Sequence, residues 1–267
     1  MNLFAIIRWT LWQRRWSTFW WSVGSAAFIA LVVIAYPPFR DQAAALNQSL
    51  DQLPQAVKSL VSDSNDFLSP VGYMSSNAYY LVLPILLGIL AISMGSKLIA
   101  QDEQDHTIEL LLSRPVSRGT LLAGRGVAGL VILGVVTGVT LAATLAFAAL
   151  IDLGISFIDL TVVTLVTLLI ALLFGMVTFT LSALGKFGRT AGIGISTLLL
   201  VASYLFTSLS GTVHWLRWPA KLLPYNYFHP SEIMTGTIHW TEMSAMITAV
   251  GLLSLIAYIG FRRRDIN

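Results

Sequence analysis

The chain has 267 residues, of which 56% are hydrophobic and only 11% are charged, whereas a typical soluble domain carries roughly 25% charged residues. Together with a mean hydropathy of +0.76, this composition indicates a polytopic membrane protein and argues against a soluble globular fold. The chain contains no cysteine, which excludes a disulfide framework, a thiol nucleophile and a cysteine-ligated metal.

Residues 1–15 combine Arg8, Arg14 and Arg15 with the beginning of a stripe of indoles. The indoles recur near helical spacing at Trp9, Trp12, Trp16 and Trp20. Tryptophan favours the headgroup level of a bilayer, where an apolar ring meets a polar N–H. We therefore expect residues 1–15 to form an amphipathic helix at the interface that leads into a first membrane span.

Six apolar stretches follow, each close to the roughly 20 residues that a helix needs to cross a bilayer. They cover residues 16–36, 78–96, 126–150, 160–181, 191–209 and 243–261, and none contains Asp, Glu, Lys, Arg or His. Pro37 and Pro38 are expected to end the first span, and Pro84 to kink the second. The sequence thus predicts an all-α polytopic membrane protein, with residues 1–267 forming one transmembrane domain.

The third span carries small residues at steps of four, and small residues let a second helix approach closely. They are Gly134, Gly138, Ala142 and Ala146. This face is expected to serve either packing within the chain or a seam with a second copy, and the sequence leaves both open.

Orientation follows from the positive charges. Six spans place both termini on one side, together with the loops around residues 97–125 and 182–190. That side carries twelve Lys and Arg residues and the other side four, namely Arg40, Lys58, Arg217 and Lys221. Because cytoplasmic loops are enriched in Lys and Arg, both termini are predicted to be cytoplasmic.

Two outer segments are long enough to hold structure. Residues 37–77 are polar, and 41–62 is compatible with a short amphipathic helix. Residues 211–242 interleave Trp and Tyr with three prolines, which favours short helices at the outer interface before the last span.

The common catalytic motifs are absent from the sequence. No Walker A motif, no H-E-x-x-H motif and no serine hydrolase signature is present. Ion-coupled carriers place ionisable side chains at membrane depth, and these spans have none. Any energy for transport would therefore come from outside the spans. His214, His229 and His239 share the outer face, where they serve either as interface residues or, less simply, as metal ligands.

Residues 97–125 form the one long, densely charged segment between two spans. Thr107 can cap a short helix that has Glu109 in its first turn, and Pro115 would end that helix. Ser117 or Thr120 can then cap the helix that enters the third span. This short helix would either pack on the membrane surface or act as a rigid knob for a cytoplasmic partner.

The same segment resembles the signature of the ABC-2 type permeases, the membrane subunits of one class of ATP-binding-cassette exporters. In that family an acidic run precedes L-E-L-L-L-S-x-P-V-S-R and a basic residue entering the next span. The matching positions are Asp102, Glu103, Thr107, Glu109, Leu110, Leu111, Leu112, Ser113, Pro115, Val116, Ser117 and Arg118. His106 stands where the family usually has Gly, and Arg125 stands where Lys is frequent.

The resemblance implies that this segment, including Arg114, is a coupling helix for a cytoplasmic ABC ATPase. It also implies two ATPase copies, a second permease copy in a homodimer or with a related chain, and the plasma membrane of a prokaryote. ATP and Mg would bind the partner, so this chain would need no cofactor, perform no catalysis and bind no nucleic acid.

The apolar spans suit a hydrophobic or amphipathic cargo such as a lipid, drug or peptide, carried outward. Hydroxyls at Thr137, Thr140, Thr144, Thr178 and Thr180 offer either a polar pathway or bonds within their own helices. The competing function is a non-transporting membrane anchor or sensor that recruits a cytoplasmic partner through the same loop.

Overall fold

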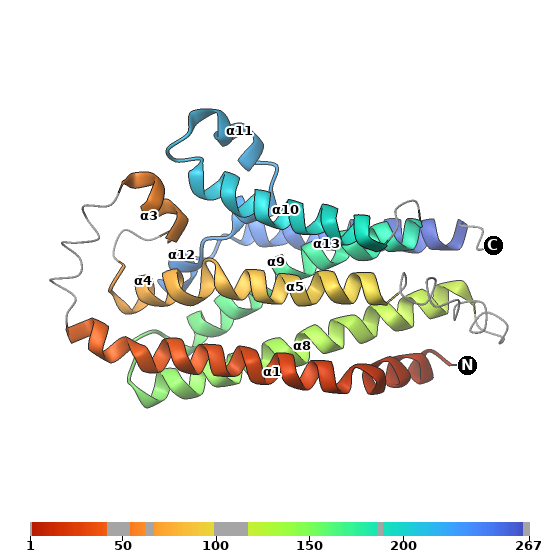
Figure 1. Ribbon diagram of the computed structural model, residues 1–267, viewed down its shortest axis with the longest axis horizontal. Coiled ribbons are helices and arrows are strands. Elements are labelled where there is room, and N and C mark those ends of the chain that lie inside the picture. Colours follow the sequence, from red (N-terminus) through yellow and green to blue (C-terminus); the bar gives the residue numbers. More distant parts are fainter. Residues whose placement is uncertain are drawn as a thin grey trace.

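The structure is a computed structural model that describes residues 2–41, 54–61, 63, 67–98, 117–185 and 189–263. Six helices in these ranges are apolar and long enough to cross a membrane, and no strand occurs there. Figure 1 shows the long helices side by side along the long axis of the molecule. The predicted all-α polytopic membrane fold is confirmed. The long helices are α1 (Leu3–Asp41), α5 (Val82–Lys97), α8 (Arg118–Leu150), α9 (Phe157–Leu184), α10 (Arg189–Leu209) and α13 (Trp240–Arg263).

Both chain ends lie at the same end of the bundle (Figure 1). We call this the terminal end; α5 ends there, and α8 and α10 begin there. The opposite, distal end carries the short helices α3 (Gln55–Val61), α4 (Pro70–Met74), α11 (Arg217–Ala220) and α12 (Pro230–Met234). Short helices before the last span were expected from the sequence, and α11 and α12 confirm them.

The first span differs from expectation at its C-terminal end. Residues 3–15 form the opening turns of α1, which continues without a break to Asp41. The prediction that Pro37 and Pro38 end this helix is therefore wrong. A proline so close to the end of a helix removes only a backbone donor of the last turns. The rings of Tyr36 and Phe39 also pack against Tyr73 of α4, with centroids 4.9 and 5.7 Å away, and hold these turns in place.

The second span is interrupted, as Pro84 predicted. After α4 a π-helical turn, Ser75–Tyr79, leads to Leu81, whose φ of −123° and ψ of −57° lie outside the helical range. Pro84 has no N–H, so the carbonyl of Tyr80 four residues earlier lacks its helical donor. The hydroxyl of Tyr225, from the distal segment, donates to that carbonyl instead.

α9 is the central helix and contacts α5, α8, α10 and α13. It crosses α5 at small residues: a Cβ added to Gly175 would lie 2.7 Å from the Cβ of Ala91, and one added to Gly95 would lie 2.5 Å from the carbonyl oxygen of Gly175. Such residues allow two backbones to approach closely in a membrane, where packing replaces the hydrophobic effect as the driving force. α1, by contrast, packs mainly on α8.

The distal end is closed by a cluster of buried tyrosines. The rings of Tyr80, Tyr204 and Tyr225 contact one another edge to face, and Tyr225 is fully buried. Asp63 fixes the loop after α3, because its carboxylate accepts hydrogen bonds from the Ser75 hydroxyl and, at 3.0 Å, from the Ser231 amide in α12. These bonds bind the distal helices to the membrane helices.

Candidate functional site

Most of the predicted coupling segment lies outside the described residues. This applies to Asp102, Glu103, Thr107, Glu109, Leu110, Leu111, Leu112, Ser113, Arg114 and Pro115. The structure describes the two anchors of the segment, namely Leu98 after α5 and Ser117 before α8. Arg118 is the first residue of α8. The contacts of these anchors show which helices are connected to the two ends of the segment.

Ser117 is the N-cap of α8, one of the two residues, Ser117 and Thr120, that the sequence offered for this role. Its backbone is extended, with φ −70° and ψ 144°, and its Oγ accepts a hydrogen bond of 3.1 Å from the amide of Thr120. The cap satisfies one of the free N–H groups at the start of the helix. The segment 99–116 is therefore followed directly by α8, whose first turn is capped.

Arg125 of α8 contacts the first anchor, Leu98. Its Nη1 donates a hydrogen bond of 2.6 Å to the carbonyl oxygen of Leu98, and the residue is only 9% exposed. The positive charge lies at the C-terminus of α5, where the helix dipole and unpaired carbonyls favour a cation. The sequence marked Arg125 as the basic residue entering the span, but this pairing depends on tertiary structure.

Glycines bring the start of α8 into contact with two other helices. A Cβ on Gly124 would lie 2.9 Å from the Ile6 side chain of α1, and one on Gly119 would lie 3.0 Å from the Tyr258 ring of α13. Together with Arg125, these contacts connect the first turns of α8 to α1, α5 and α13. A displacement of this end of α8 would therefore change its contacts with three other helices.

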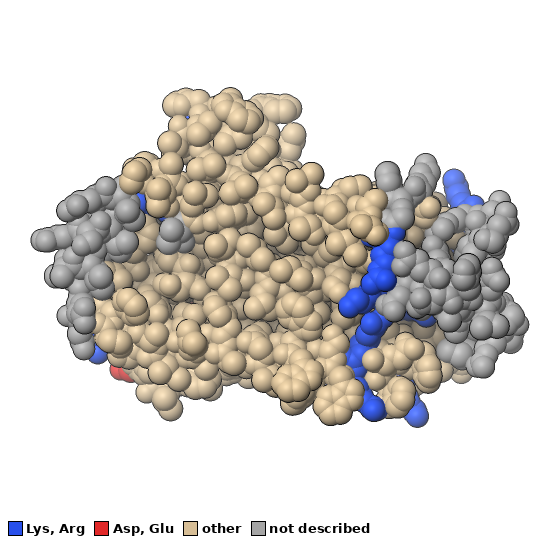
Figure 2. Space-filling view, in the orientation of Figure 1, with Lys and Arg blue, Asp and Glu red and all other residues tan. Residues whose placement is uncertain are grey.

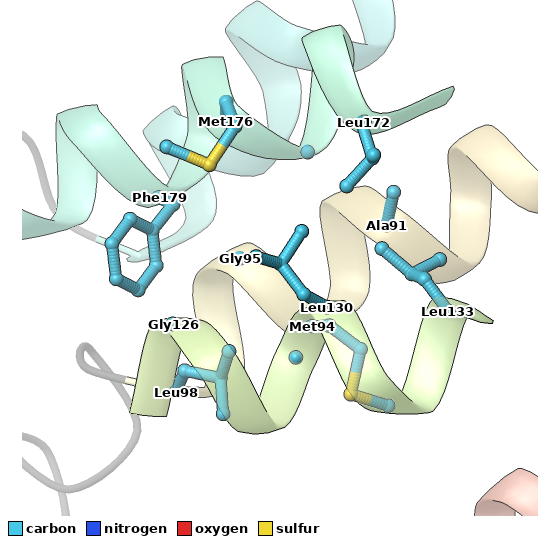
Figure 3. Close-up of a pocket in the computed structure, with 12 residues that line it drawn as sticks. Ala91, Met94, Gly95, Leu98, Gly126, Leu130, Leu133, Leu172, Met176 and Phe179 are labelled. Carbon is cyan, nitrogen blue, oxygen red and sulfur yellow. The ribbon is translucent and has the colours of Figure 1, made fainter. Parts of the chain in front are cut away.

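A small apolar cavity lies next to this junction, between α5, α8 and α9 (Figure 3). Gly95, Gly126 and Gly175 form part of its wall, and Met94, Met176 and Phe179 contribute side chains. Its volume is about 30 Å³, comparable to the space of a single water molecule. The cavity offers no polar side chain to a ligand, so it is a packing gap at the helix crossing and too small for a transported molecule.

Four of the five hydroxyls considered as a polar pathway bond to their own helices, whereas the Thr137 hydroxyl is buried without a hydrogen-bond partner among the described residues. Thr140, Thr144 and Thr178 are fully buried, and each donates to the carbonyl four residues earlier, at 2.8, 2.9 and 3.2 Å. Thr180 does the same at 2.7 Å. These four hydroxyls are therefore engaged within their own helices.

The small residues of the third span point away from the rest of the chain. Gly134, Gly138, Ala142 and Ala146 are exposed on α8, and a Cβ on Gly134 or Gly138 would meet no atom within 4 Å. The close helix crossing within the chain is made by α5 and α9 instead. A seam with a second copy stays a prediction for this α8 face.

Of the three outer histidines, His229 and His239 lie close together. His239 Nε2 lies 2.7 Å from Oε2 of Glu232, and its ring is 6.2 Å from that of His229. The hydrogen bond with Glu232 raises the pKa of His239 above its usual value. In the described part of the chain, no three His, Cys, Asp or Glu residues come together as metal ligands.

Comparison with known proteins gives one family. The sequence model described as "ABC-2 family transporter protein" matches residues 13–266. This range includes all but the first turns of α1, both anchors of the 99–116 segment and the whole of α13. A search of curated proteins finds no match.

Proposed function

Because the chain belongs to the ABC-2 transporter family, we propose that this permease subunit couples ATP hydrolysis in a separate cytoplasmic ABC ATPase to outward movement of a hydrophobic or amphipathic substrate. The observation that carries the proposal is the family match, which covers residues 13–266 and therefore the coupling-like segment. The complete transporter would contain two ATPase subunits, which bind ATP and Mg, and two permease chains.

The mechanism depends on residues 107–113 as the helix that the ATPase grips. Glu109, Arg114 and Arg118 would form charge pairs with the partner, and the leucines between them would supply an apolar anchor. When ATP draws the ATPase subunits together, the segment would move with them. The Arg125 bond to Leu98 and the contacts of Gly119 and Gly124 support α8 as the element that carries this movement into the bundle.

The orientation belongs to the same proposal. Figure 2 shows a band of Lys and Arg side chains across the molecule near the terminal end. Cytoplasmic boundaries of membrane proteins are enriched in these residues. The terminal end, with both chain ends and residues 99–116, would therefore face the cytoplasm of a prokaryotic cell.

The test is a mild detergent pull-down of the tagged full chain from its native membrane, with stoichiometry read by mass spectrometry. We expect an equimolar soluble protein that carries a Walker A motif. Glu109→Ala with Arg118→Ala should lower its recovery about tenfold or more, because each change removes a charged contact. Arg217→Ala, on the distal side, is the matched control and should leave recovery unchanged.

Two outcomes would argue against the proposal. Recovery of no ATPase from a well-folded chain would favour the non-transporting anchor or sensor. Full recovery with the Glu109 and Arg118 variants, accompanied by normal substrate-stimulated ATPase activity, would show that the ATPase is gripped elsewhere.

A further inference from the structure

A groove lies between α1 and α5. α1 packs mainly on α8 and makes few contacts with α5, and the space left between them measures about 280 Å³. Its lining residues are Trp20, Trp21, Gly24, Ser25 and Leu86. This volume is close to the lower limit for pockets that hold small molecules, roughly 300 Å³.

The groove is apolar and open to the surroundings of the bundle. The hydroxyl of Ser25 is engaged, since its Oγ lies 2.8 Å from the Thr140 hydroxyl and donates at 3.2 Å to the Ser22 carbonyl. Trp20 is 65% exposed, and a Cβ on Gly24 would meet no atom within 4 Å. In a membrane this space faces lipid chains, so an apolar occupant suits it.

A group of cations lies on the terminal side of the groove. The charges of Arg14 on α1 and Arg189 at the start of α10 both act on Lys97, the last residue of α5. Figure 2 shows Lys and Arg side chains as a band that crosses this face from α1 toward α5.

The spacing between the cations and the groove matches the shape of a phospholipid. At 1.5 Å per helical residue, Arg14 precedes Trp21 by about 10 Å along α1, and Lys97 follows Leu86 by about 16 Å along α5. A lipid whose phosphate lies among the cations would therefore direct an acyl chain along the groove. Basic pockets between membrane helices on the cytoplasmic side commonly bind anionic headgroups.

We propose that Arg14, Lys97 and Arg189, with the groove between α1 and α5, form a binding site for one anionic diacyl phospholipid. The headgroup phosphate contacts the three cations, and one acyl chain packs against Trp20, Trp21 and Leu86. A zwitterionic lipid fits the groove equally well but gains less from the charges. This lipid is a bound partner of the permease and not its cargo, so the site does not depend on the proposed export function.

Native mass spectrometry of the detergent-purified full chain tests the site. Palmitoyl-oleoyl phosphatidylglycerol and the matching phosphatidylcholine are the two probes. We expect one tightly retained phosphatidylglycerol per chain and a preference over phosphatidylcholine of roughly 100-fold, from about 1 kcal/mol for each of three cations. Arg14→Gln, Lys97→Gln and Arg189→Gln together should abolish this preference.

Two matched controls separate the site from general attraction. Arg262→Gln with Arg263→Gln removes cations at the same end of the bundle but on α13, and should keep the preference. At Gly24 an added Cβ would meet no atom within 4 Å, so Gly24→Leu places an apolar side chain in the groove and should weaken retention of phosphatidylglycerol about tenfold or more. Gly251→Leu, also at an open helical glycine, should not.

The proposal is overturned if the α13 variant loses the preference as fully as the triple variant, because surface charge alone would then explain binding. It is also overturned if the triple variant retains the lipid normally. Normal retention by Gly24→Leu would remove the groove from the site.

Discussion

At the scale of single residues, Arg125 connects α8 to the end of α5, on either side of residues 99–116. Its guanidinium donates to the last carbonyl after α5 from a position that is almost fully buried. Hydrogen bonds that involve a charged group contribute about 1.5–3 kcal/mol to stability. We therefore expect Arg125→Met to lower the free energy of unfolding by about that amount, measured by SDS titration with tryptophan fluorescence.

The control for this change is Arg263→Met, at the exposed end of α13, which should leave the unfolding free energy nearly unchanged. Arg125→Lys keeps the charge but replaces the planar fork by a single ammonium, and should recover part of the loss. Equal stability of the Arg125→Met and Arg263→Met proteins would show that the bond to Leu98 contributes nothing.

At the scale of elements, a residue from a distant segment supplies the hydrogen bond that the interrupted second span lacks. Pro84 deprives the carbonyl of Tyr80 of its helical donor, and the Tyr225 hydroxyl supplies another. Burial raises the pKa of Tyr225 well above its usual value, so the hydroxyl remains protonated and able to donate. The bond fastens the distal helices to the break in the span.

Tyr225→Phe should therefore destabilise the protein by about 1–3 kcal/mol, because a buried carbonyl loses its partner. Pro84→Ala provides an N–H within reach of the same carbonyl. In the Tyr225→Phe background, Pro84→Ala should restore part of the lost stability. In the wild-type background, where the carbonyl already has a donor, Pro84→Ala should add little stability. The four proteins of this double-mutant cycle are compared by SDS unfolding, and strictly additive effects would refute the shared carbonyl.

Helix packing shows why the sequence could predict elements better than their contacts. Residues at steps of four on α8 were singled out as a close-packing face, yet Ala91, Gly95 and Gly175 make the close crossing inside the chain. Both sets have the same small-residue pattern. The pattern indicates that a helix can pack closely against another one, but it does not indicate which helix the partner is. Pro84 and Ser117, by contrast, act on their own backbones. The interruption near Pro84 is confirmed, and of the two caps that the sequence offered for α8 the structure has Ser117 and not Thr120.

At the scale of the whole molecule, the six spans followed from hydropathy because bilayer thickness imposes a length on each helix. The coupling segment was identified from its motif alone, and its role stays a prediction, since residues 99–116 are outside the described part. The Arg125 junction and the groove between α1 and α5 could not be foreseen. Each depends on residues that are far apart in sequence and come together only in the packed bundle.

The overall orientation gives the last prediction, and the absence of cysteine makes it simple to test. A cysteine introduced at Asn2 or Ser117, both exposed at the terminal end, should react with a membrane-impermeant maleimide only after the cells are opened. One at Thr212 or Thr237, both exposed toward the distal end, should react in intact cells. This pattern follows from the order of the six spans along the sequence, which assigns twelve of the sixteen Lys and Arg residues to the side of the termini. The reverse pattern would place residues 99–116 outside the cell, beyond the reach of any cytoplasmic ATPase, and the proposed coupling would be untenable.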